Sequence, residues 1–474
     1  MADAEQKMSR LQLTAMVVGG MVGAGIFSLP RTFAYATGPL GAAVAWLVAG
    51  VGMYTLARVF QALAERKPKL DAGVFMYAKE GFGDYPGFLS AFGYWIGSCI
   101  GNVSYWVLIK STLGVFFPVF GDGNTLAAIL VASVGIWLFH FLILRGVKQA
   151  AFLNTVVTFA KVIPIIVFIV IMIFAFKLDT FRLNIASAAQ EGGIFGQVRA
   201  TMLVTVFVFI GIEGASVYSR YAKERADVGR ATIFGFGGVT ALMVFVSMLP
   251  FAALPRGDVA LMRQPSMAVV LERVVGPWGG IFVSIGLLIS VLGAYLAWSL
   301  ICAEVMFAAA RNQDMPAMFA RENANNVPAN ALWITNIVVQ LLVASTYFSR
   351  DAFALMLNLT SAMSLIPYLL VAGYGWMLSN RGESYELRPE ERRRDLALAS
   401  VAVIYTVFMI IAGGLKFILL SAVLYAPGTA LYVLARRERN LKVFDSMREW
   451  LIFIVAAVAA IVGIISLMTG RIAI

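Results

Sequence analysis

The feature that most constrains the fold of this chain is a succession of apolar stretches, each about as long as a membrane span. A helix needs about 20 predominantly apolar residues to cross about 30 Å of hydrocarbon. Charged residues form only 13% of the sequence, against about 25% in soluble domains. Because helices satisfy their own backbone hydrogen bonds in lipid, we expect an all-α polytopic membrane protein with 12–13 transmembrane helices. The candidate spans are residues 11–35, 38–62, 86–112, 125–144, 149–176, 200–221, 231–254, 277–310, 330–348, 352–378, 395–412, 415–435 and 449–469.

The formal net charge of +11 is explained by orientation in the membrane, not by binding of nucleic acid. Lys and Arg concentrate in segments that face the cytoplasm if the N-terminus lies inside, as the positive-inside rule requires. These segments include residues 66–69, 220–230, 392–394 and 436–439. The polar N-terminus enters its apolar run without a small-residue cleavage site, so we predict a retained first helix and a cytoplasmic N-terminus.

Nothing in the sequence predicts an enzyme, a metal site or a cofactor. No stretch between spans is long enough for a soluble domain, and the motifs of zinc proteases, serine hydrolases and P-loop proteins are absent. The two cysteines, Cys99 and Cys302, lie in apolar runs without metal-ligand spacing, and His140 is the sole histidine. We expect one membrane domain over residues 1–435, followed by a linker and an additional C-terminal transmembrane helix at 436–474.

Two spans carry glycine clusters that disfavour an uninterrupted helix. The first span contains Val18–Pro30 and the sixth contains Phe207–Ser216. Glycine costs about 1 kcal/mol relative to alanine inside a helix, so such clusters mark breaks. First and sixth are corresponding positions in two halves of five, which is the pattern of an inverted repeat with a site at the membrane midplane. The alternative is that these glycines only permit close helix packing.

The order and spacing of several motifs resemble the amino acid–polyamine–organocation (APC) transporter superfamily. Within it they are most similar to the basic amino acid/polyamine antiporters, of the arginine/ornithine and arginine/agmatine kind. The resemblance covers roughly residues 8–435 and implies a LeuT-type 5+5 inverted repeat with broken helices 1 and 6, its repeats at about 11–176 and 200–378 followed by helices 11–12. The motifs are Val22–Phe27, Phe209–Glu213, the loop 72–83 and the stretch Trp298–Pro328.

The resemblance implies that the substrate backbone binds at the two helix breaks. The carboxylate would meet Gly23, Ala24, Gly25 and Ile26, where the arginine exchangers carry Gly-Ser-Gly. Because this chain has Ala24, the serine hydroxyl is missing, which removes one hydrogen bond to a charged group. The α-ammonium would meet carbonyl groups near Ala24 and in the sixth span.

The resemblance also implies a cover and a wall for the bound substrate. Phe207 and Ile210 lie in the sixth span, and Phe207 matches a tryptophan that covers the substrate. Trp298 matches an aromatic residue that stacks on the cationic side chain. Asn102 and Thr360 match polar positions around that side chain; their alternative role is an interhelical hydrogen bond.

Ionisable residues within spans are functional candidates by default. Glu213 matches the gate glutamate of the family, and Tyr94 and Tyr368 match aromatic gate positions. Lys161 resembles a lysine whose amine takes the place of a sodium ion; its alternative is a fixed structural charge. Glu304 would either attract the cationic substrate or neutralise Lys161.

These expectations predict a secondary transporter of the bacterial inner (cytoplasmic) membrane. It would exchange a cationic amino acid, arginine or lysine, for ornithine, a polyamine or a related cation. The alternatives are a proton-coupled amino acid uptake permease and a non-transporting amino acid sensor. The family resemblance also raises a homodimer, for which the sequence shows no face.

Overall fold

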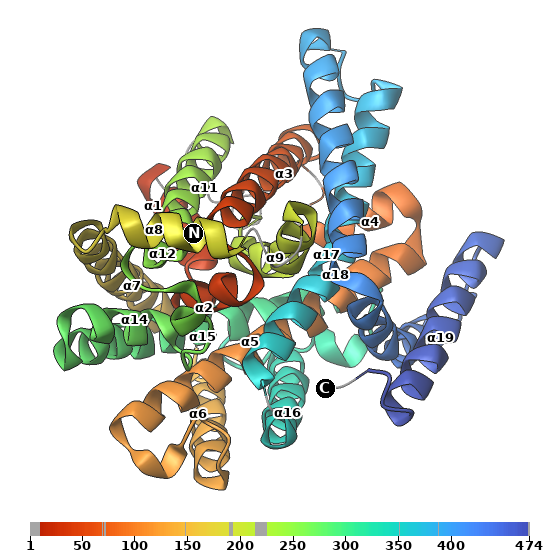
Figure 1. Ribbon diagram of the computed structural model, residues 1–474. Helices are drawn as coiled ribbons and strands as arrows, with labels where there is room; N and C mark the ends of the chain where they lie inside the picture. Colours follow the sequence, from red (N-terminus) through yellow and green to blue (C-terminus); the bar gives the residue numbers. More distant parts are fainter. Residues whose placement is uncertain are drawn as a thin grey trace.

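In the computed structural model, the described part of the chain is residues 10–472 without 69, 71–72, 147, 189–192, 214–224, 350 and 387. This part is helical throughout, with no strand among the described residues (Figure 1). The helices are α1 (Arg10–Met21), α2 (Gly25–Ala36), α3 (Pro39–Arg66), α4 (Val74–Phe82), α5 (Asp84–Phe116), η1 (Pro118–Phe120), α6 (Leu126–Leu144), α7 (Lys148–Phe174), α8 (Leu178–Ala188), α9 (Ile194–Phe209), α11 (Arg225–Met248), α12 (Pro250–Ala253), α13 (Arg256–Ala260), α14 (Ser266–Val275), α15 (Pro277–Arg311), η3 (Ala317–Ala320), α16 (Ala329–Ser345), η4 (Thr346–Phe348), α17 (Ala352–Arg381), α18 (Pro389–Arg437) and α19 (Met447–Met468).

Nine helices in the described residues are long and apolar enough to cross a membrane, and the number is eleven if each of two bent pairs counts as one span. This confirms a polytopic all-helical membrane protein, and each span expected from the sequence overlaps a helix. The count differs from 12–13 for two reasons. The helix α9 is only 16 residues long before the chain turns. The range of α18 contains both spans expected at 395–412 and 415–435, separated by a kink at Gly414, whose φ of 78° and ψ of 167° are not helical.

The break expected in the first span is present, and the helix of the sixth span ends within its glycine cluster; residues 214–221 of that expected span lie outside the described residues. Helix α1 ends at Met21 and α2 begins at Gly25, and these two helices are bent by 46° relative to each other. Helix α9 ends at Phe209, and the next residues are non-helical. Gly211 has φ 107°, a backbone conformation that favours glycine. Helix α5 runs through the middle of the bundle against α15, α16 and α17, and its residues from Tyr85 to Thr112 are buried.

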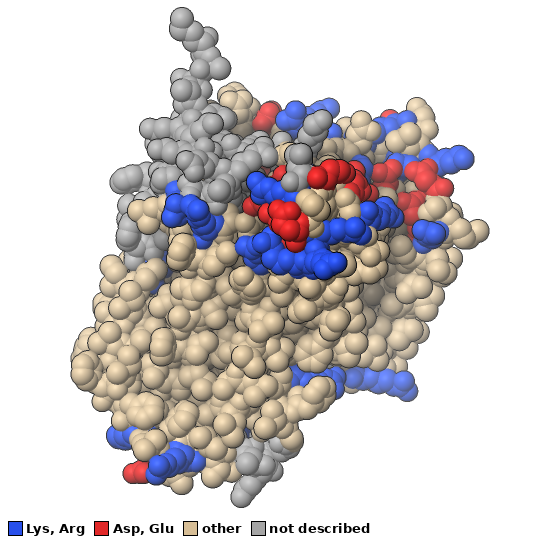
Figure 2. Space-filling view, turned by 90° about the horizontal axis from the view of Figure 1, so that it is seen from above, with Lys and Arg blue, Asp and Glu red and all other residues tan. Residues whose placement is uncertain are grey.

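Charged side chains lie in two layers, separated by a broad band without visible Asp, Glu, Lys or Arg apart from one basic patch at its edge (Figure 2). The more heavily charged layer is called the charged face here. An apolar band of this kind fits a hydrocarbon layer. On the charged face, Lys79 of α4 donates to Asp314 at 2.8 Å, and Arg436 of α18 donates to Asp84 at 2.8 Å. These ion pairs connect the ends of α4, α5, α15 and α18.

Helix α19 packs along α18 at the periphery of the bundle (Figure 1). Its first turn is fixed to the charged face, because the Glu449 carboxylate accepts from the backbone N–H of Tyr85 at 3.0 Å and of Asp445 at 2.8 Å. The rest of α19 exposes apolar side chains such as Leu451, Val455 and Ile461. An apolar helix with only one packed side fits a lipid-facing position.

Candidate functional site

A pocket lies where the two broken helices meet α5, α15 and α17. The empty space there is about 420 Å³ with open solvent included. Seven of its lining residues are expected substrate positions: Gly23, Gly25, Asn102, Phe207, Ile210, Trp298 and Thr360. The structure therefore brings these residues together from five separate segments. Ala24 and Ile26 do not line the pocket but flank the lining glycines in the chain.

The start of α2 offers backbone donors to this pocket. Ala24 is the N-cap residue, and no side chain caps the helix. The first N–H groups of a helix have no intrahelical acceptor, and the helix dipole favours negative charge there. The nearby hydroxyl of Ser28 donates to the carbonyl of Gly25 at 2.7 Å, which leaves the first N–H groups to another acceptor. The arrangement fits a carboxylate.

The two breaks approach each other through glycine. A Cβ atom added to Gly211 would lie 2.7 Å from the carbonyl carbon of Gly20, closer than real contacts permit. A Cβ atom added to Gly25 would lie 2.8 Å from the ring of Phe207. The absence of side chains at Gly25 and Gly211 therefore lets α1, α2 and the end of α9 meet at the pocket.

Aromatic and polar side chains form the other walls. Trp298, Phe207 and Asn102 are each at least nine-tenths buried. The Asn102 amide nitrogen lies 3.7 Å from the Cys302 sulfur, and no described group hydrogen-bonds its carbonyl oxygen. Thr360 donates to the backbone of its own helix at 2.8 Å. The pocket thus combines an aromatic face with a free amide oxygen, two groups that suit a cationic side chain.

The three expected gate residues come together beside the pocket. One carboxylate oxygen of Glu213 accepts from the Tyr94 hydroxyl at 2.5 Å. The other accepts from the Tyr368 hydroxyl at 3.0 Å and from the backbone N–H of Gly211 at 3.1 Å. Through this carboxylate, the turn after α9 is fixed to α5 and α17.

Lys161 and Glu304 lie in different surroundings. The Lys161 amine is buried and donates to the carbonyl of Gly19 at 2.9 Å, in the last turn of α1. A cation at this end of a helix is favoured by the helix dipole. Glu304 is exposed on α15 and does not line the pocket. The expected ion pair between them is not among the salt bridges of the described residues.

Sequence reasoning missed several residues that line the pocket, among them Ser98, Tyr105 and Ser364. A positional signal was present for each. Ser98 precedes Asn102 by four residues and Tyr105 follows it by three, so all three share one face of α5. Ser364 follows Thr360 by four residues on α17.

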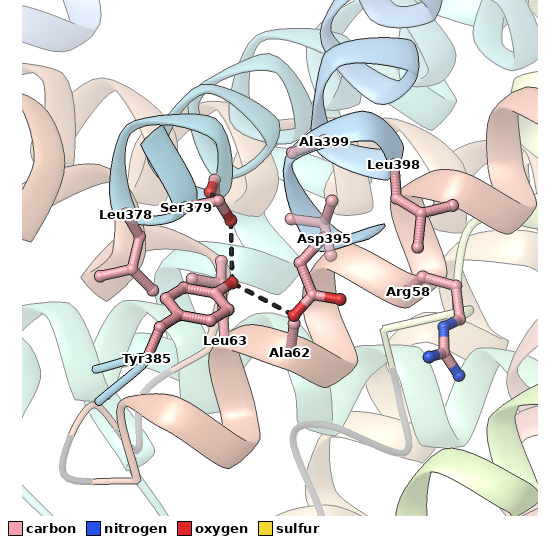
Figure 3. Close-up of a pocket in the computed structure, with 11 residues that line it drawn as sticks. Arg58, Ala62, Leu63, Leu378, Ser379, Tyr385, Asp395, Leu398 and Ala399 are labelled. Carbon is pink, nitrogen blue, oxygen red and sulfur yellow. Dashed lines mark hydrogen bonds between the residues drawn. The ribbon is translucent and has the colours of Figure 1, made fainter. Parts of the chain in front are cut away.

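A second pocket, of about 270 Å³, opens on the charged face between α3, α17 and α18 (Figure 3). Its central hydroxyl, that of Tyr385, contacts the Ser379 hydroxyl at 2.8 Å and donates to the Asp395 carboxylate at 3.1 Å. Arg66 at the end of α3 donates to Glu391 at 2.5 Å and to Asp395 at 3.3 Å, and its guanidinium lies 3.6 Å from the centre of the Tyr385 ring.

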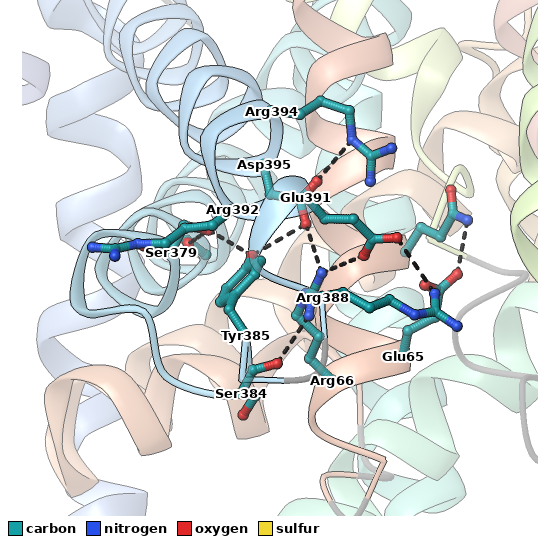
Figure 4. Close-up of polar contacts among 12 residues, drawn as sticks. Glu65, Arg66, Ser379, Ser384, Tyr385, Arg388, Glu391, Arg392, Arg394 and Asp395 are labelled. Carbon is teal, nitrogen blue, oxygen red and sulfur yellow. Dashed lines mark hydrogen bonds and ion pairs between the residues drawn. The ribbon is translucent and has the colours of Figure 1, made fainter.

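Most charges of this second site already have protein partners (Figure 4). Arg394 and Arg66 share the Asp395 carboxylate, and Arg388 reaches Glu391 at 3.4 Å. A network whose charges are satisfied internally holds helices together and leaves little for a ligand to bind. The pocket at the helix breaks is therefore the better candidate for a ligand site.

Elsewhere on the charged face, burial changes the pKa of the carboxyl group in the ion pair between Lys79 and Asp314. Desolvation raises the pKa of Asp314 to about 6, although the Lys79 amine acts in the opposite direction. One oxygen of this carboxyl has no partner among the described residues. The connection between α4 and the loop after α15 therefore carries an incompletely compensated charge.

Comparison with known proteins agrees with this geometry. The profile of the family described as amino acid permease matches residues 8–418. The arginine/ornithine antiporter of Pseudomonas aeruginosa is 52% identical over 99% of this chain and 98% of its own length. The L-lysine transport protein of Corynebacterium glutamicum is 40% identical over 99% and 97%, and the arginine/agmatine antiporter of Chlamydia caviae is 38% identical over 99% and 98%. The chain belongs to the amino acid permease family.

Proposed function

We propose that this protein is an antiporter that exchanges a cationic amino acid, arginine or lysine, for ornithine, a polyamine or a related cation. The observation that carries the proposal is a single pocket with an uncapped helix start at one side and Trp298 and Asn102 at the other. An α-amino acid with a cationic side chain has a carboxylate at one end, for the start of α2, and a positive charge at the other end, for Trp298 and Asn102. The names of its full-length relatives, which describe arginine, ornithine, agmatine and lysine as their substrates, support the same substrate class.

The chemistry of binding follows from the ends of the broken helices. The substrate carboxylate accepts from N–H groups at Gly25 and its neighbours, where the positive end of the α2 dipole lies. The α-ammonium donates to carbonyl groups at the ends of α1 and α9, which have no intrahelical donors. The cationic side chain stacks on Trp298 and donates to the Asn102 oxygen. Phe207 covers the substrate above Gly25.

The proposed architecture is the LeuT-type 5+5 inverted repeat, with repeats at about 11–176 and 200–378 and two further helices within α18. Helix α19 adds a further span after the linker at 436–446. The N-terminus lies in the cytoplasm of a bacterium and the protein spans the inner membrane. Support comes from breaks at corresponding positions of the two halves and from the basic segments near the charged face. A homodimer remains a prediction from the family.

The gate and the coupling are proposed from contacts beside the pocket. Glu213, Tyr94 and Tyr368 connect the turn after α9 to α5 and α17, so movement of these helices changes access to the substrate. The Lys161 amine at Gly19 supplies a positive charge where a sodium-coupled relative would need an ion, which favours sodium-independent exchange.

Purified protein in liposomes tests the proposal. Uptake of radiolabelled arginine is measured with internal ornithine, arginine, lysine, agmatine or no substrate. We expect rapid uptake only with an internal cation. Uptake into empty liposomes that needs an inward proton gradient would replace antiport by proton-coupled uptake. Binding without flux under any condition would establish an amino acid sensor instead.

A further inference from the structure

The hydroxyl that the family's serine supplies at the first helix break is missing at Ala24, but another hydroxyl lies beside the neighbouring Gly23. A Cβ atom added to Gly23 would lie 2.8 Å from the Tyr105 hydroxyl oxygen. Gly23 is in the short break between α1 and α2, beside the uncapped start of α2. Tyr105 reaches this break from α5.

The Tyr105 side chain is 7% exposed and lines the pocket. No hydrogen bond from its hydroxyl is found within the described part of the chain. A buried phenol normally has a hydrogen-bond partner, so this hydroxyl requires one from the contents of the pocket.

We propose that Tyr105 is a specificity-determining residue, whose hydroxyl donates to the substrate carboxylate at the break between α1 and α2. This inference rests on the proposed function and goes beyond it, because it assigns the carboxylate to a side chain on α5. A phenol donor suits an anion, since hydrogen bonds to charged acceptors are short and strong. The donor compensates for Ala24.

Two neighbours on one helix face then recognise opposite ends of the substrate. Tyr105 faces Gly23 of the first break, whereas Asn102 faces Cys302 of α15. Their Cα atoms are three residues apart, which is about 4.5 Å along the α5 axis. The pair therefore distinguishes an amino acid from its decarboxylation product, which keeps the cationic side chain and lacks the carboxylate.

Binding of arginine and agmatine to Tyr105→Phe tests this assignment. Agmatine has the side chain of arginine and no carboxylate. Equilibrium binding of each radiolabelled compound is measured on purified protein in detergent. We expect the Kd for arginine to rise roughly 10-fold to 100-fold, the range for loss of a hydrogen bond to a charged group. The Kd for agmatine changes by less than about threefold.

The matched control is Tyr425→Phe, which also removes a buried tyrosine hydroxyl. That hydroxyl donates to the carbonyl of Met363 at 3.3 Å, and Tyr425 does not line the pocket. This variant keeps both Kd values. If Tyr105→Phe does not fold, Tyr105→Leu gives the same comparison, with each variant's folding checked by size-exclusion chromatography.

The outcomes separate this inference from the proposed function. If Tyr105→Phe weakens the binding of arginine and agmatine equally, or weakens neither, the role of Tyr105 is overturned. The proposed function is unaffected by that result as long as the wild-type protein binds arginine. Wild-type protein that binds neither compound overturns the proposed function, and the inference with it. Selective weakening of arginine supports both.

Discussion

At the scale of single residues, the Glu213 carboxylate holds three parts of the molecule together. In the wild-type protein, two hydroxyl groups and one backbone N–H donate to the Glu213 carboxylate. The substitution Glu213→Gln replaces one of its acceptor oxygens with an NH₂ group, which faces these donors and cannot accept from them. We expect arginine exchange in liposomes to slow by about tenfold or more, since bonds to a charged group are worth about 1.5–3 kcal/mol each. Arginine affinity changes less, because Glu213 does not line the pocket.

The control for this prediction is Glu322→Gln, which removes a carboxylate exposed in the loop before α16. It keeps the wild-type exchange rate. An unchanged rate in Glu213→Gln would mean that the contacts with Tyr94 and Tyr368 do not take part in gating. Equal losses of rate and affinity would instead indicate that the substitution distorts the pocket itself.

The residues that sequence reasoning identified are those with unusual chemistry for their surroundings. Asn102 and Glu213 are conspicuous because polar and ionisable groups are costly within a membrane. Clustered glycines are conspicuous because each costs about 1 kcal/mol relative to alanine inside a helix. Tyr105 is one of 16 tyrosines, and its importance depends on its distance to Gly23, which the sequence does not contain. Glu304 shows the opposite case. As a charged residue within an apolar stretch it is a candidate from sequence, but whether it faces the pocket depends on how α15 packs, and it does not line the pocket.

At the scale of elements, the contact between the two broken helices depends on Gly211. We expect Gly211→Ala to abolish arginine binding or lower the thermal unfolding temperature clearly. Its φ of 107° strains an L-residue, and the new Cβ meets backbone atoms of Gly20 and Met21, which cannot move cheaply. Strain of this kind costs about 1–3 kcal/mol per residue. Binding assays and thermal unfolding of detergent-purified protein measure it.

The matched control is Gly237→Ala in α11. Nothing lies within 4 Å of a Cβ added there, and alanine favours a helix by about 1 kcal/mol relative to glycine. This variant is expected to unfold at the same or a higher temperature and to bind arginine normally. If Gly211→Ala behaves like Gly237→Ala, the close approach of the two breaks is not needed for the site.

The same elements show what patterning can and cannot predict. Hydropathy located the spans, because each needs an apolar run of bilayer length. The glycine clusters located the break between α1 and α2 and the end of α9. Hydropathy also separated the two spans at 395–412 and 415–435, which meet at the non-helical Gly414. At about 1.5 Å per residue, the 49 residues of α18 measure about 74 Å, more than twice the hydrocarbon thickness. The bend at Gly414 is where the chain reverses between two crossings.

At the scale of the whole molecule, the two charged layers and α19 predict the topology of the chain. The charged face contains the Arg66 and Arg436 networks, and basic residues are retained on the cytoplasmic side. Helix α19 begins at this face, because Glu449 contacts the start of α5. Its 22 residues measure about 33 Å, enough to cross the bilayer. Residue 469 should therefore lie outside.

Labelling of introduced cysteines with a membrane-impermeant reagent measures this topology. We expect Thr469→Cys to react in right-side-out spheroplasts, and Glu390→Cys to react only after the membrane is opened; both positions are exposed. The parent protein is the control, since Cys99 and Cys302 are fully buried. Reaction of Glu390→Cys from outside would invert the proposed orientation. If both positions react only after opening, the two ends of α19 lie on the same side of the membrane, and α19 lies along the membrane surface. An apolar helix with one packed side fits either the hydrocarbon layer or its surface, so the position of its far end decides between the two.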